Sequence, residues 1–195
     1  MRKVTGRRGV NRLGDGVAVE TFRYASWLPF PRDVVWRWHE QPHALTLLTP
    51  PSQHLTLLER TDAHDGTALG AGTRLKMRVR DGLLPLTILA EHTDAKPPHS
   101  FTDSMLRGPF RRWVHHHLFD VSVRHHTHGT LVTDIVHWQL PLAPVSHWFA
   151  GWMVRRKLRA MFAYRHSALL RDLLGDDAPS LPPDASLRLA GVAVE

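Results

Sequence analysis

The stretch FTDSMLRGPFRRWVHHHLFDVSVRHHTHGTLVTDIVHWQLP, residues 101–141, carries the clearest pattern in the chain. Successive side chains of a β-strand point to opposite faces. A strand over residues 113–123 therefore places on one face Trp113, His115, His117, Phe119, Val121 and Val123. After a turn-like segment, residues 125–129, a second strand over 131–140 gathers Val132, Asp134, Val136, Trp138 and Leu140. An aromatic face that also holds two histidines and an acid indicates the lining of a pocket rather than a plain core.

The segments before this stretch predict more strands, at residues 17–28, 54–60, 74–80, 86–94 and 99–106. The run Arg74–Arg80 alternates most strictly, with bases at every second position and Leu75, Met77 and Val79 between them. This pattern is typical of an antiparallel strand with one buried face. We therefore expect the four bases to face solvent and the three apolar side chains to be buried.

Helical patterns predict two short helices, at residues 33–41 and 43–48, and one long amphipathic helix at 145–174 with Gly175 as its C-cap. Residues 1–16 are expected to form a disordered basic leader, and the Pro-containing tail at 176–195 to be loosely ordered. One domain, residues 17–175, lies between them. The order of elements predicts the α+β helix-grip class, in which a curved antiparallel sheet wraps around a long C-terminal helix.

The distribution of charged residues bears on whether the chain binds nucleic acid. Of the 25 basic residues, five lie in the first twelve positions, where there is no acid, so the rest of the chain is close to neutral despite the pI of about 10.7. This distribution disfavours nucleic acid as a partner. The chain has no cysteine and no apolar run of the roughly 20 residues that span a bilayer, and we expect a cytoplasmic protein.

Four local motifs resemble a bacterial subgroup of the SRPBCC, or START-like, superfamily. They are an F-x-D strand at Phe101–Asp103, a G-x-F turn at Gly108–Phe110, a W-x-H-x-H-x-F strand at Trp113–Phe119 and a D-x-V strand at Asp134–Pro141 that ends in Leu-Pro. The resemblance covers about residues 18 to 174. It implies a helix-grip fold with a cavity for a hydrophobic ligand, but no particular chemistry, because the superfamily includes carriers, sensors and enzymes.

On this basis we expect the chain to bind or carry a hydrophobic or amphipathic small molecule, lipid-like or polyketide-like, in a cavity between sheet and helix. We expect no cofactor. The predicted ligand-binding residues are Met77, Phe101, Trp113, His115, His117, Phe119, Asp134, Val136, Trp138, Met153 and Phe162.

The two histidines of the pocket face, His115 and His117, allow three interpretations. The first, which we favour, is a polar patch in which both hydrogen-bond to Asp134 or to backbone carbonyls. The second is a metal site completed by a carboxylate from Asp134, Asp103 or Glu91. The third is catalysis: a His oriented by Asp134 acts as a general base in a polyketide cyclase or dehydratase, a lyase or isomerase. The histidines at 125, 126 and 128 lie in the predicted turn, where we expect only adventitious metal binding.

The C-terminal helix carries further candidate contacts. Trp148, Trp152, Met153 and Met161 could meet a ligand from the helix side, although core packing is the more frequent explanation of such a stripe. A basic cluster at Arg155, Arg156, Lys157 and Arg159 suggests a third function, docking to a membrane surface or a protein partner. A solvated helix face is the simpler explanation of that cluster.

Overall fold

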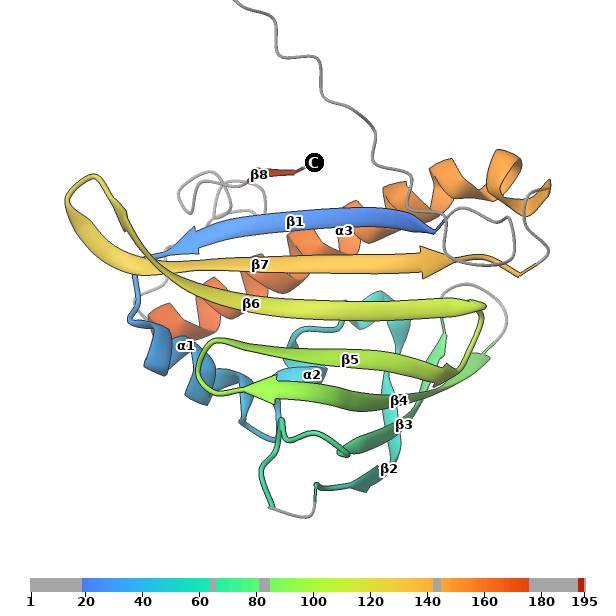
Figure 1. Cartoon of the computed structure of the whole chain (residues 1–195), viewed down its shortest axis with the longest axis horizontal. Helices are drawn as coiled ribbons and strands as arrows, with labels where there is room; N and C mark the ends of the chain where they lie inside the picture. Colours follow the sequence, from blue (N-terminus) through green and yellow to red (C-terminus); the bar gives the residue numbers. More distant parts are fainter. Residues whose placement is uncertain (1–18, 64–65, 81–84, 142–144, 176–192, 195) are drawn as a thin grey trace, which may run out of the picture.

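A computed structural model describes residues 19–63, 66–80, 85–141, 145–175 and 193–194 of the chain. The predicted leader and most of the predicted tail lie outside these ranges. An antiparallel sheet with strand order β2-β3-β4-β5-β6-β7-β1-β8 forms the body of the domain (Figure 1). Its strands are β1 (Glu20–Leu28), β2 (Thr56–Thr61), β3 (Arg74–Arg80), β4 (Pro85–Lys96), β5 (Ser100–Arg107), β6 (Arg112–Arg124), β7 (Thr127–Gln139) and β8 (Ala193–Val194).

The sheet curves around one long helix, α3 (Val145–Leu174), which runs behind β1 and β7 (Figure 1). Between β1 and β2 the chain forms α1 (Arg32–His39), α2 (Ala44–Leu47) and the 3-10 turn η1 (Pro51–Gln53). Gly175 follows α3 with a φ of 64°, the left-handed conformation of a C-capping glycine. This is the helix-grip architecture that the sequence predicts.

The β6–β7 hairpin is tighter than the sequence suggests. Its turn consists of His125 and His126, with φ of 48° and 62°, and β7 already begins at Thr127. Two consecutive residues with positive φ make the turn whose twist matches that of a two-stranded hairpin. The turn expected over 125–129 is therefore present but shorter, because histidine occupies positions where glycine or asparagine is the usual signal.

Alternation along β3 agrees with the prediction. The four bases of the strand are exposed, and the apolar Leu75, Met77 and Val79 are half-buried. These three side chains remain partly exposed because they line a cavity and do not pack against another layer. The inward face of β6 likewise follows the predicted parity, but only as far as Phe119, since Val121 and Val123 are 60% and 57% exposed.

Two hydrophobic clusters hold the helices to the sheet. In one, α3 packs against β1 and β7, and its members are Phe22, Tyr24, Val136, Trp138, Leu158 and Phe162. In the other, α1 and the end of α3 cover the opposite end of the sheet, where Trp36 meets Phe101 and Phe119 edge to face. Together the clusters set the spacing between helix and sheet at both ends, and this spacing determines the room left between them.

The apolar stripe expected along α3 is narrower than predicted. Leu158, Phe162 and Leu169 are buried, whereas Trp152 and Met153 are 68% and 47% exposed. At about 100° per residue, these two side chains point about 120° and 140° away from Leu158. Trp152 and Met153 therefore lie on the solvent side of the helix; the side chain of Trp148 lies outside the described residues.

The final described segment is a short strand within the predicted loose tail. Ala193 and Val194 pair antiparallel with Ala25 and Tyr24 of β1. These two residues extend the sheet beyond β1. Across the described ranges, no helix combines the length and the apolar character needed to cross a bilayer.

Replacing two glycines by alanine tests the packing, because the two substitutions should change the free energy of unfolding in opposite directions. A Cβ on Gly129 would lie 2.3 Å from the Leu28 carbonyl oxygen, whereas one on Gly151, inside α3, would meet nothing closer than 4.0 Å. We expect Gly129→Ala to lower the free energy of unfolding by about 1–3 kcal/mol, because backbone must move to admit the methyl group. Gly151→Ala should raise it by up to about 1 kcal/mol through helix propensity. Urea denaturation of both variants measures the effects, and equal stabilities would contradict the β1–β7 approach described here.

Candidate functional site

A cavity of about 360 Å³ lies between the sheet and the helices. Its apolar lining includes Leu75, Met77 and Val79 of β3 and Ile88 and Ala90 of β4, together with apolar side chains of residues 42–57. Its polar wall comes from the middle of β5 and β6, and α3 contributes Val154, Lys157, Leu158, Met161 and Arg165. The cavity thus combines an extensive apolar lining with a cluster of ionisable groups on β5 and β6.

The polar wall is formed by alternate residues of two neighbouring strands, because successive side chains of a strand point to opposite faces. Phe101, Asp103 and Met105 share one face of β5, and Trp113, His115 and His117 share the matching face of β6; all six line the cavity. In the ladder, Asp103 lies opposite His115, and His117 lies opposite Asp134 of β7. The register that the sequence left open therefore brings both histidines against two carboxylates.

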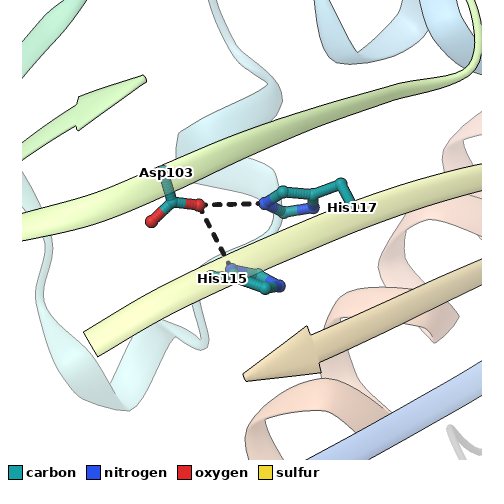
Figure 2. Close-up of side chains that lie close together, drawn as sticks. All are labelled: Asp103, His115 and His117. Atoms are coloured by element: carbon teal, nitrogen blue, oxygen red, sulfur yellow. Dashed lines mark hydrogen bonds and ion pairs between the residues drawn. The ribbon is translucent and has the colours of Figure 1, made fainter. Parts of the chain in front are cut away.

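The carboxylates hold the two imidazole rings from both sides. On the cavity side, Asp103 Oδ2 lies 3.3 Å from His115 Nδ1 and 3.0 Å from His117 Nε2 (Figure 2). On the far side, Asp134 Oδ1 lies 2.7 Å from His115 Nε2 and 2.9 Å from His117 Nδ1. Each ring therefore makes one contact to each acid through its two nitrogens.

A third histidine completes the far side. His166 of α3 contacts the other Asp134 oxygen through Nε2, and its Nδ1 meets the hydroxyl of Ser26 on β1. All three groups are almost fully buried. Sequence reasoning missed His166 and Ser26. A signal existed for the first, since His166 falls four residues after Phe162 on the buried stripe of α3, where a polar side chain needs a partner.

Aromatic rings fix the orientation of the cluster. Phe101 stacks on the ring of His117 with centroids 3.9 Å apart, and Phe162 meets His115 edge to face at 5.2 Å. The two histidine rings lie 3.8 Å from each other. Their side chains are about 5% exposed, compared with 20% for Asp103, so the carboxylate of Asp103 is the member most open to the cavity.

Charge balance decides the protonation behaviour of the cluster. Burial alone would raise the pKa of Asp103 and of Asp134, but their histidine partners outweigh it and hold both pKa values well below the usual range. Burial alone would lower the pKa of His115, but Asp103 and Asp134 outweigh it and raise that pKa. The acids are thus ionised at neutral pH, and His115 favours the charged form.

Not all of the predicted ligand-binding residues reach the cavity. Met77, Phe101, Trp113, His115 and His117 line it. Asp134 lies behind the histidines, and four predicted wall residues are instead core residues that are fully buried and absent from the lining: Phe119, Val136, Trp138 and Phe162. Met153 faces solvent, so its assignment to the ligand-binding wall is corrected. Two further histidines that the sequence did not single out, His39 and His92, line the cavity.

The remaining candidates of the sequence lie apart from this cluster. Glu91, considered as a metal ligand, forms an ion pair with Arg74 on the outer face, at 2.6 Å. In the basic cluster of α3, Arg155 pairs with Glu20, Arg156 lies over the Trp152 ring at 5.7 Å, and Lys157 lines the cavity. Arg155, Arg156 and Lys157 therefore make different contacts and do not form one uniform basic face.

Comparison with known proteins gives the fold and no closer relationship. No family model matches the chain, and no curated protein matches it. Among solved structures, the protein TTHA0849 from Thermus thermophilus is 17% identical, with a TM-score of 0.60 over 80% of this chain and 97% of that one. Norcoclaurine synthase from Thalictrum flavum is 14% identical, with a TM-score of 0.61 over 85% and 99%. Ara h 8.0201 is 16% identical, with a TM-score of 0.54 over 78% and 98%.

A buried histidine gives a pH-dependence that can be measured. His39 Nδ1 donates a hydrogen bond to the Val35 carbonyl oxygen, and burial lowers the pKa of His39 to about 3 despite that contact. Above the ordinary histidine pKa of about 6.5 the ring is neutral in both folded and unfolded chains. Below it, only the unfolded chain takes up the proton, so stability falls as the pH drops toward 3, by up to about 1.4 kcal/mol per pH unit.

We expect His39→Gln to flatten this fall between about pH 7.5 and pH 5. Urea denaturation at several pH values measures it, and His128→Gln, at an exposed position of β7, serves as the control that keeps the wild-type profile. Parallel profiles for the wild type and His39→Gln would contradict the assignment.

Proposed function

We propose that this chain, a helix-grip fold shared with the SRPBCC/START-like superfamily, binds an amphipathic small molecule in the cavity between sheet and α3. The cavity itself carries the proposal. Its volume of about 360 Å³ lies in the range of small-molecule sites, and its walls divide into an apolar part and a few convergent polar groups. A globular core packed to normal density leaves no comparable space.

The division of the walls suggests how a ligand lies. An apolar body would rest on Leu75, Met77 and Ile88, where it removes hydrocarbon surface from water at about 25 cal/mol per Å². A polar end would meet Asp103 of β5 and the histidines of β6. Lipid-like and polyketide-like molecules share this combination of an apolar body and a polar end, and carriage of such a molecule needs no reaction.

A matched pair of variants on one strand tests the binding. Met77 lines the cavity, whereas its neighbour Arg78 points to solvent. We expect Met77→Trp to fill part of the cavity and weaken the binding of a fluorescent fatty-acid analogue at least fivefold, while Arg78→Trp leaves it unchanged. Fluorescence titration gives both dissociation constants. Equal affinities in two folded variants, or no binding by the wild type of any analogue in a series of chain lengths, would refute the proposal.

The polar wall favours a second candidate function, catalysis on the bound molecule. The solved structures that share this fold include a synthase, and here Asp103, His115 and His117 lie on the cavity wall, where an imidazole held by a carboxylate could move a proton. Such a site would suit cyclisation or dehydration of a carbonyl-bearing ligand.

Binding and turnover separate the two candidates. If the chain is an enzyme, His115→Gln should abolish turnover of a polyketone while its affinity, measured by titration, stays within a few-fold of the wild type. Product analysis at several pH values should give a rate that depends on pH in the wild type. Binding without product in the wild type would leave the carrier function alone.

A further inference from the structure

The contacts of the two β6 histidines match the arrangement of a metal centre. We propose that Asp103, His115 and His117 bind a divalent first-row transition metal at the cavity wall, with Asp134 orienting both imidazole ligands. The proposal does not rest on the ligand-binding function, because the metal site is defined by its own three side chains.

The first argument is distance. Two ligands on one metal with bonds of about 2.0–2.2 Å lie about 3.0 to 3.5 Å from each other in octahedral or tetrahedral geometry. Asp103 Oδ2 lies 3.0 Å from His117 Nε2 and 3.3 Å from His115 Nδ1 (Figure 2). One donor atom from each residue lies within 4.8 Å of the others, so a metal can join all three with small side-chain shifts.

The second argument is the outer contact of each ligand. A histidine that binds a metal usually donates its other ring N–H to a carboxylate, which fixes the tautomer and the ring orientation. Asp134 Oδ1 accepts at both positions, 2.7 Å from His115 Nε2 and 2.9 Å from His117 Nδ1. His166 holds the second Asp134 oxygen in turn. The acid that orients the two rings is itself fixed.

The third argument is charge. The two carboxylates of the cluster, Asp103 and Asp134, balance the charge of a divalent cation. A metal bound to His115 Nδ1 and His117 Nε2 would leave the other nitrogen of each ring in contact with Asp134.

Three protein ligands leave coordination positions open, and all three residues line the cavity. Two imidazoles and one carboxylate suit zinc or iron(II) better than calcium or magnesium, which prefer oxygen. A group of the bound small molecule, or water, can therefore complete the coordination. A metal held by these three residues could therefore contact a bound ligand directly.

Metal titration of the full chain tests the proposal. Protein made without a histidine tag is stripped with a chelator and titrated with Co²⁺, followed by visible absorption, and with Zn²⁺, followed by calorimetry. We expect one site per chain with a dissociation constant below about 1 μM for Zn²⁺. Asp103→Asn and His117→Gln should each weaken it at least 100-fold, and Asp134→Asn, which removes an orienting contact, about 10- to 100-fold.

The β6–β7 turn provides the matched control. His125, His126 and His128 are exposed and close in sequence, so they could bind added metal adventitiously. Their replacement by asparagine, which tolerates the positive φ of the turn, should leave the tight site intact. Circular dichroism confirms that each variant is folded.

Two outcomes would overturn the proposal. One is a folded wild type that binds neither metal more tightly than about 100 μM. The other is a site that survives Asp103→Asn and disappears in the turn variant, which would assign the metal to surface histidines. Either result leaves the binding test at Met77 unaffected, so the failure of the metal site and the failure of the ligand-binding function remain distinguishable.

Discussion

The carboxylate of Asp134 is the interaction on which the site depends. A buried charge is costly unless it is paired and hydrogen-bonded, and Asp134 meets this demand with three histidines from two elements: His115 and His117 of β6, and His166 of α3. Through His166 the contact continues to Ser26 of β1. One side chain thus links the long helix to the sheet and orients both imidazole rings that reach the cavity.

The cavity follows from how the sheet and helices meet. The two hydrophobic clusters hold α3 and α1 against the sheet, and side chains of β3 and β4 line the space that remains between sheet and helices. Half-buried apolar side chains on β3 line that space, and the histidine cluster closes its polar end. The same packing that stabilises the domain therefore leaves room for a ligand and places ionisable groups beside it.

Much of this arrangement could be predicted from periodicity. The alternation of β3 and β6, the length of α3 and its capping glycine gave the correct elements, because burial of one face leaves a period of two or of 3.6 in any sequence. The turn was expected at residues 125–129, but its restriction to His125 and His126 was not predicted, since its backbone conformation is adopted without the usual residues. The exposure of Trp152 and Met153 was not predicted either, because an apolar residue can lie on the solvent face of a helix without a local signal.

The sequence by itself determined which side chains share a strand face, because that depends only on the geometry of one strand. It thereby placed His115 with His117 and Asp134 with Trp138. Only the tertiary structure decided which of these faces meet. Strand register sets Asp134 opposite His117 and Asp103 opposite His115, and helix packing adds His166 from 32 residues away. Register and packing depend on the summed contacts of the whole sheet, so no local pattern carries them.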